Sequence, residues 1–372
     1  MNKFVKLDWI MLAAVALLLI IGLMALYSIS YEDAHFNSTN FNKQLLSSVL
    51  GIILLFFLSF YDYRVLGSYS SKFYFAILII LALVIFFGTT VRGTTGWIGL
   101  GSYHIQPVEM AKLVMIIFLA SFFSKKKNQL SIIVRIAASV ILVFVPIFLI
   151  LNQPDFGSAA IIVGSWAVML SISGVNKKNL LILAMCGTLA VSSSWFFLKT
   201  YQKERVINFI NPERDPRGSG YNVIQSIVAV GSGSLLGKGL GHGSQSQLNF
   251  LPEKHTDFIF AVISEELGLL GASAVFVLFG IVFWRAKEAA RLARDNFGYL
   301  LSVGIITMLF LQILVNIGMN IGVMPVAGVP LPLLSYGGSS LLAVLASLGI
   351  IQSVYLRRVR NIDSSSLFYA DE

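Results

Sequence analysis

Long apolar stretches, separated by short polar segments, run through most of the chain. A helix needs about 20 apolar residues to cross the hydrocarbon core of a bilayer. By that measure the pattern predicts an all-α integral membrane protein with about ten transmembrane helices. The predicted spans are 9–29, 45–61, 74–90, 107–124, 131–151, 156–174, 179–198, 258–284, 298–322 and 335–356.

One polar segment, residues 199–257 between the seventh and eighth spans, is far longer than the others. Its apolar stretches 206–210 and 223–230 are typical of short helices that lie on a membrane surface. Before the tenth span, residues 324–340 carry three prolines and several glycines. Broken backbone at membrane depth is tolerated where it lines protein or a water-filled cavity. The chain is therefore predicted to be one polytopic domain, residues 1–372, with a large loop and a re-entrant segment before the last span.

Composition excludes a water-soluble protein. The 372 residues are 56% hydrophobic and only 12% charged, whereas soluble domains carry about 25% charged residues. The net charge of +9 follows the topology: with both termini inside, the cytoplasmic segments hold sixteen Lys and Arg and the outer segments hold nine. The sequence thus predicts a multi-pass protein of a cytoplasmic membrane with the large loop outside. The positive charge does not indicate nucleic-acid binding.

Ionisable residues inside a membrane span are costly to bury and indicate function. Glu109 and Lys112 lie three residues apart near the start of the fourth span, on one helical face. They form either a self-neutralising structural pair or the polar lining of an outward-open cavity, with Lys112 available to an anionic group. Asp155 lies in a tight turn before the sixth span. It is either a helix N-cap or a carboxylate that faces the cavity.

The large loop carries candidate cations. Arg214 and Arg217 lie in a turn-rich stretch, and the planar donor fork of arginine suits phosphate oxygens; a solvated charged loop is the alternative. Lys238 lies in a glycine-rich stretch that fails the Walker A pattern, because Ser232 and Gly239 stand at two of its required positions. Nucleotide binding is therefore excluded, although a glycine-rich backbone suits a pyrophosphate.

Asp257 lies where the large loop meets the eighth span, close to His255. A carboxylate there either complements the helix dipole or acts as a general base at the water–lipid boundary. Glu265 and Glu266 lie deeper and are expected to be buried and partnered. From these features alone, the sequence indicates an outward-facing polar cavity beside lipid. Such a cavity fits either an enzyme on a lipid-linked substrate or a transporter.

Five stretches resemble the SEDS family (shape, elongation, division and sporulation), in the family's order among the spans. They are QPVEMAKL at 106–113, NQPDFGSA at 152–159, DPRGSGYNVIQS at 215–226, HGSQSQLNFLPEKHTDFIFAVISEELG at 242–268 and PVAGVPLPLLSYGGSS at 325–340. The resemblance covers nearly the whole chain. The HGSQSQL run and the GVPLPLLSYGG form are similar to the family's elongation members rather than its division members.

The resemblance implies a glycosyltransferase that joins lipid II, the undecaprenyl-pyrophosphate-linked disaccharide peptide, into β-1,4 glycan strands on the outer face of the membrane. The family's essential aspartate falls on Asp257, which we expect to take a proton from a sugar 4-hydroxyl. The donor linkage is α and the product β, so a single inverting displacement suffices, with undecaprenyl pyrophosphate as leaving group. Candidate residues for binding the pyrophosphate or lining the cavity are Glu109, Lys112, Asp155, Arg205, Arg214, Arg217, Lys238, His255 and Ser335.

The resemblance also implies partners: a class B penicillin-binding protein transpeptidase, the elongation machinery and membrane lipid. A divalent cation, Mg²⁺ or Mn²⁺, is compatible with a pyrophosphate site, although no standard metal motif demands one. The alternatives are a lipid II flippase or other transporter, because broken helices and a charged pair are transporter features too, a division paralogue with the same chemistry, and a non-enzymatic scaffold. The large outer loop that ends in a base, together with the resemblance, favours the enzyme.

Overall fold

The structure is a computed structural model of the chain. It describes residues 3–32, 35–36, 39–91, 94–101, 103–125, 131–194, 196, 203–204, 207, 209–211, 219–248 and 250–358.

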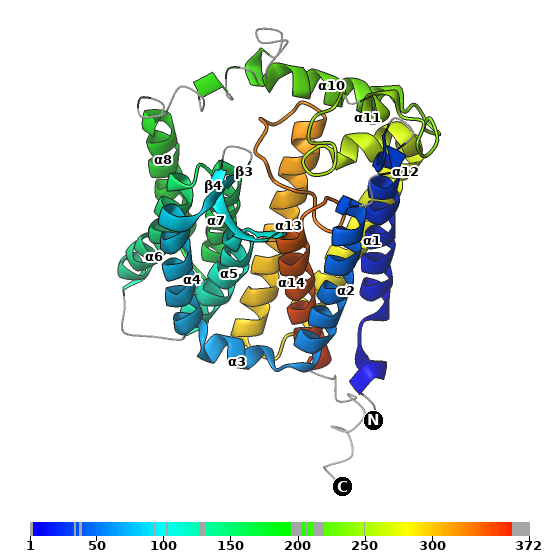
Figure 1. Cartoon of the computed structure of the whole chain (residues 1–372). Coiled ribbons are helices and arrows are strands. Elements are labelled where there is room, and N and C mark those ends of the chain that lie inside the picture. Colours follow the sequence, from blue (N-terminus) through cyan, green and yellow to red (C-terminus); the bar gives the residue numbers. More distant parts are fainter. Residues whose placement is uncertain are drawn as a thin grey trace.

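Each of the ten predicted spans overlaps a helix (Figure 1), so the all-α membrane architecture is confirmed. Within the described residues, eight helices are long and apolar enough to cross a membrane: α1 (Trp9–Ile29), α2 (Thr39–Phe60), α4 (Ser70–Phe87), α5 (Pro107–Ser124), α6 (Ile132–Asn152), α12 (Ile259–Arg291), α13 (Asn296–Asn320) and α14 (Gly338–Leu356). The apolar α7 (Phe156–Ile172) is shorter, and α8 (Lys177–Ser194) is not among the eight. The number of ten spans therefore stays a prediction.

The centre of the bundle is formed by α5 and α14, whose most apolar stretches are 78% buried, against 17% for α6 at the periphery. Glycines let α2 and α14 approach closely. A Cβ added at Gly349 would lie 2.6 Å from the Leu55 carbonyl oxygen, and one at Gly51 would lie 2.3 Å from Leu345 Cδ1. Small residues at helix contacts are a common means of close packing in membranes.

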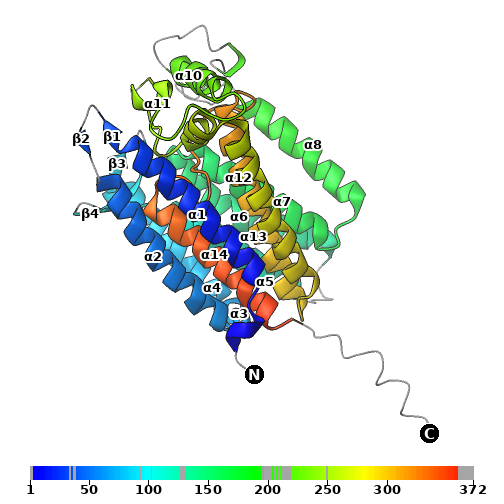
Figure 2. The ribbon, with the colours of Figure 1, turned by 90° about the vertical axis from the view of Figure 1, so that its right-hand side faces the viewer.

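The two ends of the bundle differ. One end carries α10 (Ser219–Ser232) and α11 (Ser244–Gln247), whereas α1 starts and α14 ends at the other (Figures 1 and 2). α10 lies across the end of the bundle, as expected for the stretch 223–230. The stretch 206–210 is described only in part. The helices thus start and finish on one side, as an even number of crossings requires, but which side is cytoplasmic stays a prediction.

Short strands, which the sequence analysis did not predict, lie between α4 and α5. β3 (Thr89–Val91), β4 (Thr94–Leu100) and β5 (Tyr103–Ile105) form an antiparallel sheet in that order, with Thr89 opposite Trp97. This sheet brings β4 to the same end of the molecule as α10 (Figure 1). The remaining short elements are the 3₁₀ helix η1 (Lys3–Lys6), β1 (Tyr31–Glu32), β2 (His35–Phe36) and α3 (Tyr63–Ser68).

α12 is broken at Gly268, whose backbone has φ 65° and ψ −162°. A Cβ there would lie 2.3 Å from the backbone nitrogen of Gly237, so the position requires glycine. Residues 233–239 run beside the break and supply hydrogen bonds that the helix loses; for example, Lys238 N donates to Glu265 O at 3.0 Å. Residues 233–239 therefore complete the hydrogen bonding of the eighth predicted span at its break.

Candidate active site

Asp257 lies in a polar cavity of about 150 Å³. The starts of α5, α7, α12 and α14, strand β4 and the irregular segment before α14 meet there. The lining residues are Thr94, Trp97, Gln106, Pro154, Asp155, Thr256, Asp257, Val326, Ala327, Gly328, Pro330, Tyr336, Gly337, Gly338, Ser339 and Ser340. Segments far apart in the sequence thus converge on one carboxylate.

The structure brings a second predicted acid, Asp155, to the same cavity. Asp155 is buried and caps α7: its Oδ1 accepts from Ser158 N at 2.9 Å and its Oδ2 from Ser158 Oγ at 2.8 Å. Gln106 Nε2 lies 3.4 Å from Asp155 Oδ2. Asp155 therefore acts as a helix cap and also lines the cavity, so both alternatives from the sequence hold.

Burial raises the pKa of the Asp155 carboxyl above its usual range, although the Ser158 hydrogen bonds and the positive charge of Lys112 lower that pKa. Both oxygens of this carboxyl accept from Ser158, so burial and capping act on its pKa in opposite directions.

Glu109 and Lys112 form the predicted pair on α5. Lys112 Nζ lies 2.8 Å from Glu109 Oε1, and the two side chains are 1% and 3% exposed. Glu109 Oε2 has no hydrogen-bond partner among the described residues. Lys112 lines a small internal space with Ser165 and Met308, and it is not part of the wall of the Asp257 cavity. Glu109 and Lys112 neutralise each other in this structure, and contact of Lys112 with substrate stays a prediction.

Lys238 belongs to a different cluster. Its Nζ lies 2.8 Å from Oε1 of Glu265, which is 0% exposed, and it does not line the Asp257 cavity. Glu266 accepts from Ser28 Oγ at 2.7 Å and from Gln247 Nε2 at 3.3 Å. The expectation that both glutamates are buried and partnered is confirmed. The role of Lys238 toward a pyrophosphate stays a prediction.

His255 and Ser335 hold the backbone near Asp257 rather than line its cavity. Tyr336 N donates to His255 O at 2.9 Å. Ser335 Oγ donates to Thr256 O at 2.5 Å and accepts from Leu331 N at 2.8 Å. The irregular segment expected before the last span is thus bound to the turn that precedes α12. Outside the described residues lie the predicted cations Arg205, Arg214 and Arg217.

Two asparagines of α13 were missed by the sequence analysis. Asn316 and Asn320 are both 0% exposed, and their Nδ2 atoms donate to Asp257 O at 3.0 and 2.9 Å. A signal was present, because two amides four residues apart in an apolar span lie on one helical face and form hydrogen bonds within the bundle. Trp97, on β4, was missed because the sheet was not predicted.

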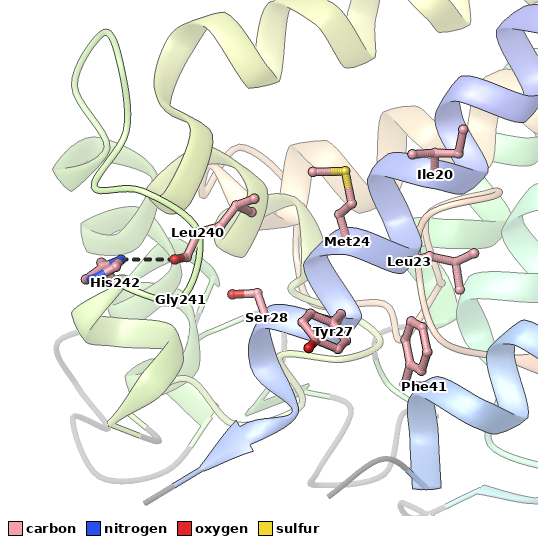
Figure 3. A pocket seen from close by; sticks show the side chains of 9 residues that line it. All are labelled: Ile20, Leu23, Met24, Tyr27, Ser28, Phe41, Leu240, Gly241 and His242. Atoms are coloured by element: carbon pink, nitrogen blue, oxygen red, sulfur yellow. Dashed lines mark hydrogen bonds between the residues drawn. The ribbon is translucent and has the colours of Figure 1, made fainter. Parts of the chain in front are cut away.

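A larger, apolar groove lies between the second half of α1 and loop residues 240–242 (Figure 3). Its volume is about 650 Å³, and the rings of Tyr27 and Phe41 meet edge to face with centroids 5.6 Å apart. His242 Nδ1 contacts Leu240 O at 3.0 Å. The groove shares no lining residue with the Asp257 cavity. The residues that line this groove suit contact with hydrocarbon, and none of those described is Asp or Glu.

Comparisons with known proteins agree with this architecture. A family model described as cell cycle protein, for FtsW, RodA and SpoVE, matches residues 8–359. Stage V sporulation protein E of Bacillus subtilis is 38% identical, over 93% of this chain and 96% of its own. Peptidoglycan glycosyltransferase MrdB of Escherichia coli is 36% identical, over 95% of each chain.

Solved structures share the fold. A chain from the work titled "Structural coordination of polymerization and crosslinking by a peptidoglycan synthase complex" has a TM-score of 0.81 and 31% identity, over 95% of this chain and 99% of that one. The rod shape determining protein RodA of Thermus thermophilus has a TM-score of 0.72 and 27% identity, over 97% of this chain and 100% of that one.

The chain is therefore a polytopic membrane protein with the fold of these cell-wall synthases. It belongs to the FtsW/RodA/SpoVE family of cell cycle proteins, the SEDS family. The predicted family and the predicted enzyme class, peptidoglycan glycosyltransferase, are both confirmed.

Proposed function

We propose that this chain is a lipid II polymerase of cell elongation, with Asp257 as its general base. The observation that carries the proposal is the position of Asp257 in a polar cavity where the starts of four helices meet. MrdB of Escherichia coli and RodA of Treponema pallidum, both named peptidoglycan glycosyltransferases, are similar to this chain over 95% of its length. Both observations support a glycosyl transfer at this cavity.

The proposed reaction is one inverting displacement. The 4-hydroxyl of one lipid II passes its proton to the Asp257 carboxylate while its oxygen bonds to the anomeric carbon of a second lipid II. The bond from that carbon to the pyrophosphate oxygen breaks, and undecaprenyl pyrophosphate leaves with the electron pair. The α donor linkage becomes a β-1,4 bond, and no covalent intermediate with the protein is required.

The leaving pyrophosphate needs positive charge near it. Lys112 is the main candidate, because its charge already acts on Asp155 in the cavity wall. To bind the pyrophosphate, Lys112 would exchange Glu109 for the new anion. The other proposed cations are Lys238, Arg205, Arg214 and Arg217.

A divalent cation, Mg²⁺ or Mn²⁺, is a further part of the proposal. Magnesium is usually bound through one or two carboxylates together with substrate phosphates, and Asp257 and Asp155 supply two carboxylates in one cavity. Among the described residues, no group of three or more His, Cys, Asp or Glu could hold a metal ion. The site therefore fits a cation that arrives with the pyrophosphate, whose charge it would neutralise.

Cellular role, partner and orientation belong to the same proposal. A similar chain comes from a peptidoglycan synthase complex, which supports a class B penicillin-binding protein as partner within the elongation machinery. The identities to SpoVE, 38%, and to MrdB, 36%, are close, so a division or sporulation paralogue with the same chemistry is the alternative. The charge bias of the loops supports a bacterial cytoplasmic membrane protein with both termini inside and the cavity outside.

The test is polymerisation of lipid II by the purified protein with its class B partner, whose transpeptidase site is blocked. Wild-type protein should make glycan polymer, and Asp257→Asn should make none, because the amide keeps the shape but takes no proton. The control is Asp62→Asn: Asp62 caps α3 at the opposite end, with a 41% exposed side chain. Asparagine is an equally good cap, so this variant should polymerise like wild type.

Each other outcome has a definite meaning. Polymer from folded Asp257→Asn at the wild-type rate would remove Asp257 as base and keep the enzyme. No polymer from wild type, with lipid II crossing proteoliposome membranes instead, would replace the enzyme by a transporter.

A further inference from the structure

The start of α12 is held partly by its own backbone and partly by a side chain of α13. Ala261 N and Val262 N donate to Phe258 O at 3.1 and 3.3 Å. The helix begins at Ile259, and its cap residue Phe258 makes no side-chain cap hydrogen bond. A helix that continued back through Asp257 would close with a bond from Ala261 N to Asp257 O. Both groups instead meet one side-chain amide. Ala261 N donates to Asn320 Oδ1 at 3.0 Å, and Asn320 Nδ2 donates to Asp257 O at 2.9 Å.

A second amide holds the same peptide against the cavity wall. Asn316 Nδ2 donates to Asp257 O at 3.0 Å and to Val329 O at 2.8 Å. Val329 lies between Gly328 and Pro330, which both line the cavity. A Cβ added at Gly328 would lie 3.8 Å from Asp257 Oδ2, so this wall runs close to the carboxylate. Asn316 therefore sets the distance between the base and the wall that faces it.

The amide of Asn320 is itself fixed. Its Nδ2 also donates to Asn316 O at 2.8 Å. Asn320 is the last residue of α13, where a carbonyl has no partner within the helix; Ser226 Oγ of α10 donates to that carbonyl at 2.8 Å. The buried amides thus form a satisfied network, which is stiff because a lost bond would leave polar groups without water.

We propose that Asn316 and Asn320 are positioning residues for Asp257. The amide of Asn320 bridges Ala261 N and Asp257 O, the two groups that one further helical turn would join, and so holds the Asp257 peptide outside the helix with its side chain at the cavity. Asn316 fixes the same peptide against the Val329 wall. The proposal rests on the role of Asp257 as base. Without the bridge, Asp257 O would lose one of its two amide donors, and the restraint on the Asp257 peptide would weaken.

The test measures α13 variants of the full chain, together with the class B partner, in the polymerisation assay. Asn320→Leu and Asn316→Leu keep the size of the side chain and remove its hydrogen bonds. Gln312→Leu is the matched control, because Gln312 is a 1% exposed amide one turn before Asn316 on the same helix. The Asn320→Leu and Asn316→Leu variants should lose about 100-fold in kcat, the effect of misplacing a catalytic group by about 1 Å. KM for lipid II should stay within about threefold, since binding is retained.

A second variant keeps the test open if Asn320→Leu does not fold. Asn320→Asp keeps an oxygen for Ala261 N and removes the donor to Asp257 O, so it should lose kcat to a similar extent. Wild-type kcat in the folded asparagine variants, a loss confined to KM, or an equal loss in Gln312→Leu would overturn the positioning role. Asp257→Asn measured alongside separates the two proposals. If it is inactive while the asparagine variants are fully active, only the positioning role fails; if it polymerises normally, the base itself fails.

Discussion

The ion pair of Glu109 and Lys112 predicts a large effect of single substitutions on stability. At 2.8 Å and an effective dielectric constant of about 20, two unit charges attract each other by about 6 kcal/mol. Glu109→Gln removes this attraction and leaves the Lys112 charge buried without a counter-charge, and Lys112→Met does the reverse. Removal of one partner from a buried pair costs about 3–5 kcal/mol. Because whole domains are stable by only about 5–15 kcal/mol, either variant should lose a large share of its stability.

Replacement of both partners should behave differently. A buried pair exchanged for neutral side chains of similar volume is often nearly neutral for stability, so Glu109→Gln with Lys112→Met should recover most of the loss. Glu288 and Arg291 provide the control, with the same i,i+3 spacing and 2.9 Å between charges, but a 72% exposed Arg291 side chain. Glu288→Gln should cost less than about 1 kcal/mol, because solvent screens the exposed pair.

The assay is the free energy of unfolding in mixed micelles with increasing denaturing detergent, followed by polymerisation of lipid II with the refolded variants. A stable double variant that makes no polymer would show that Lys112 acts on substrate. A stable double variant that is active would show a structural pair only. Single variants as stable as wild type would refute the electrostatic reasoning, because buried charges would then have found other partners.

Two further effects follow from the structure. Gly268→Ala should destabilise the protein by more than about 1 kcal/mol, because φ is 65° and the new Cβ would meet Gly237 N at 2.3 Å. Gly280→Ala in the same helix, where nothing lies within 4 Å of the new Cβ, should leave the melting temperature equal or raise it; equal losses in both would contradict the steric argument. Burial raises the pKa of the Asp155 carboxyl above its ordinary 3.8. The protonated carboxyl therefore stabilises the folded state at low pH, and this contribution is lost as pH rises through the pKa that the group has in the folded protein. Asp155→Asn should flatten that part of the stability–pH curve, and an unchanged curve would count against burial as the cause.

The helical architecture could be predicted because an apolar stretch of about 20 residues has essentially one solution in lipid. The number of ten spans stays a prediction, because α7 has only 17 residues. In addition α8, which starts with two lysines and ends with three serines, is not among the eight described helices that are long and apolar enough to cross a membrane. The sheet of β3, β4 and β5 was missed because strands this short give too few alternations to be recognised.

Site residues could be predicted only where a short sequence motif marks them. Asp257 and Asp155 each stand out in their own motif, but their common cavity depends on contacts between segments that are about a hundred residues apart, which spacing does not encode. Lys238 pairs with Glu265, a contact that its glycine-rich loop did not indicate, and its role toward a pyrophosphate stays a prediction. Asn320 acts on the backbone of Asp257, and such a role leaves no signature beyond an amide in an apolar helix.

The piece of α12 before its break at Gly268 is held at both ends by other elements. Near Gly268, residues 233–239 supply backbone hydrogen bonds, and beside Asp257 the amide of Asn320 accepts from Ala261 N and donates to Asp257 O. The piece is about 13 Å long and almost entirely buried. Glu265, near its far end, is also bonded to Lys238, Gln245 and Ser246. Packed interiors deform little, so the contacts at the two ends together restrain the start of the helix beside Asp257.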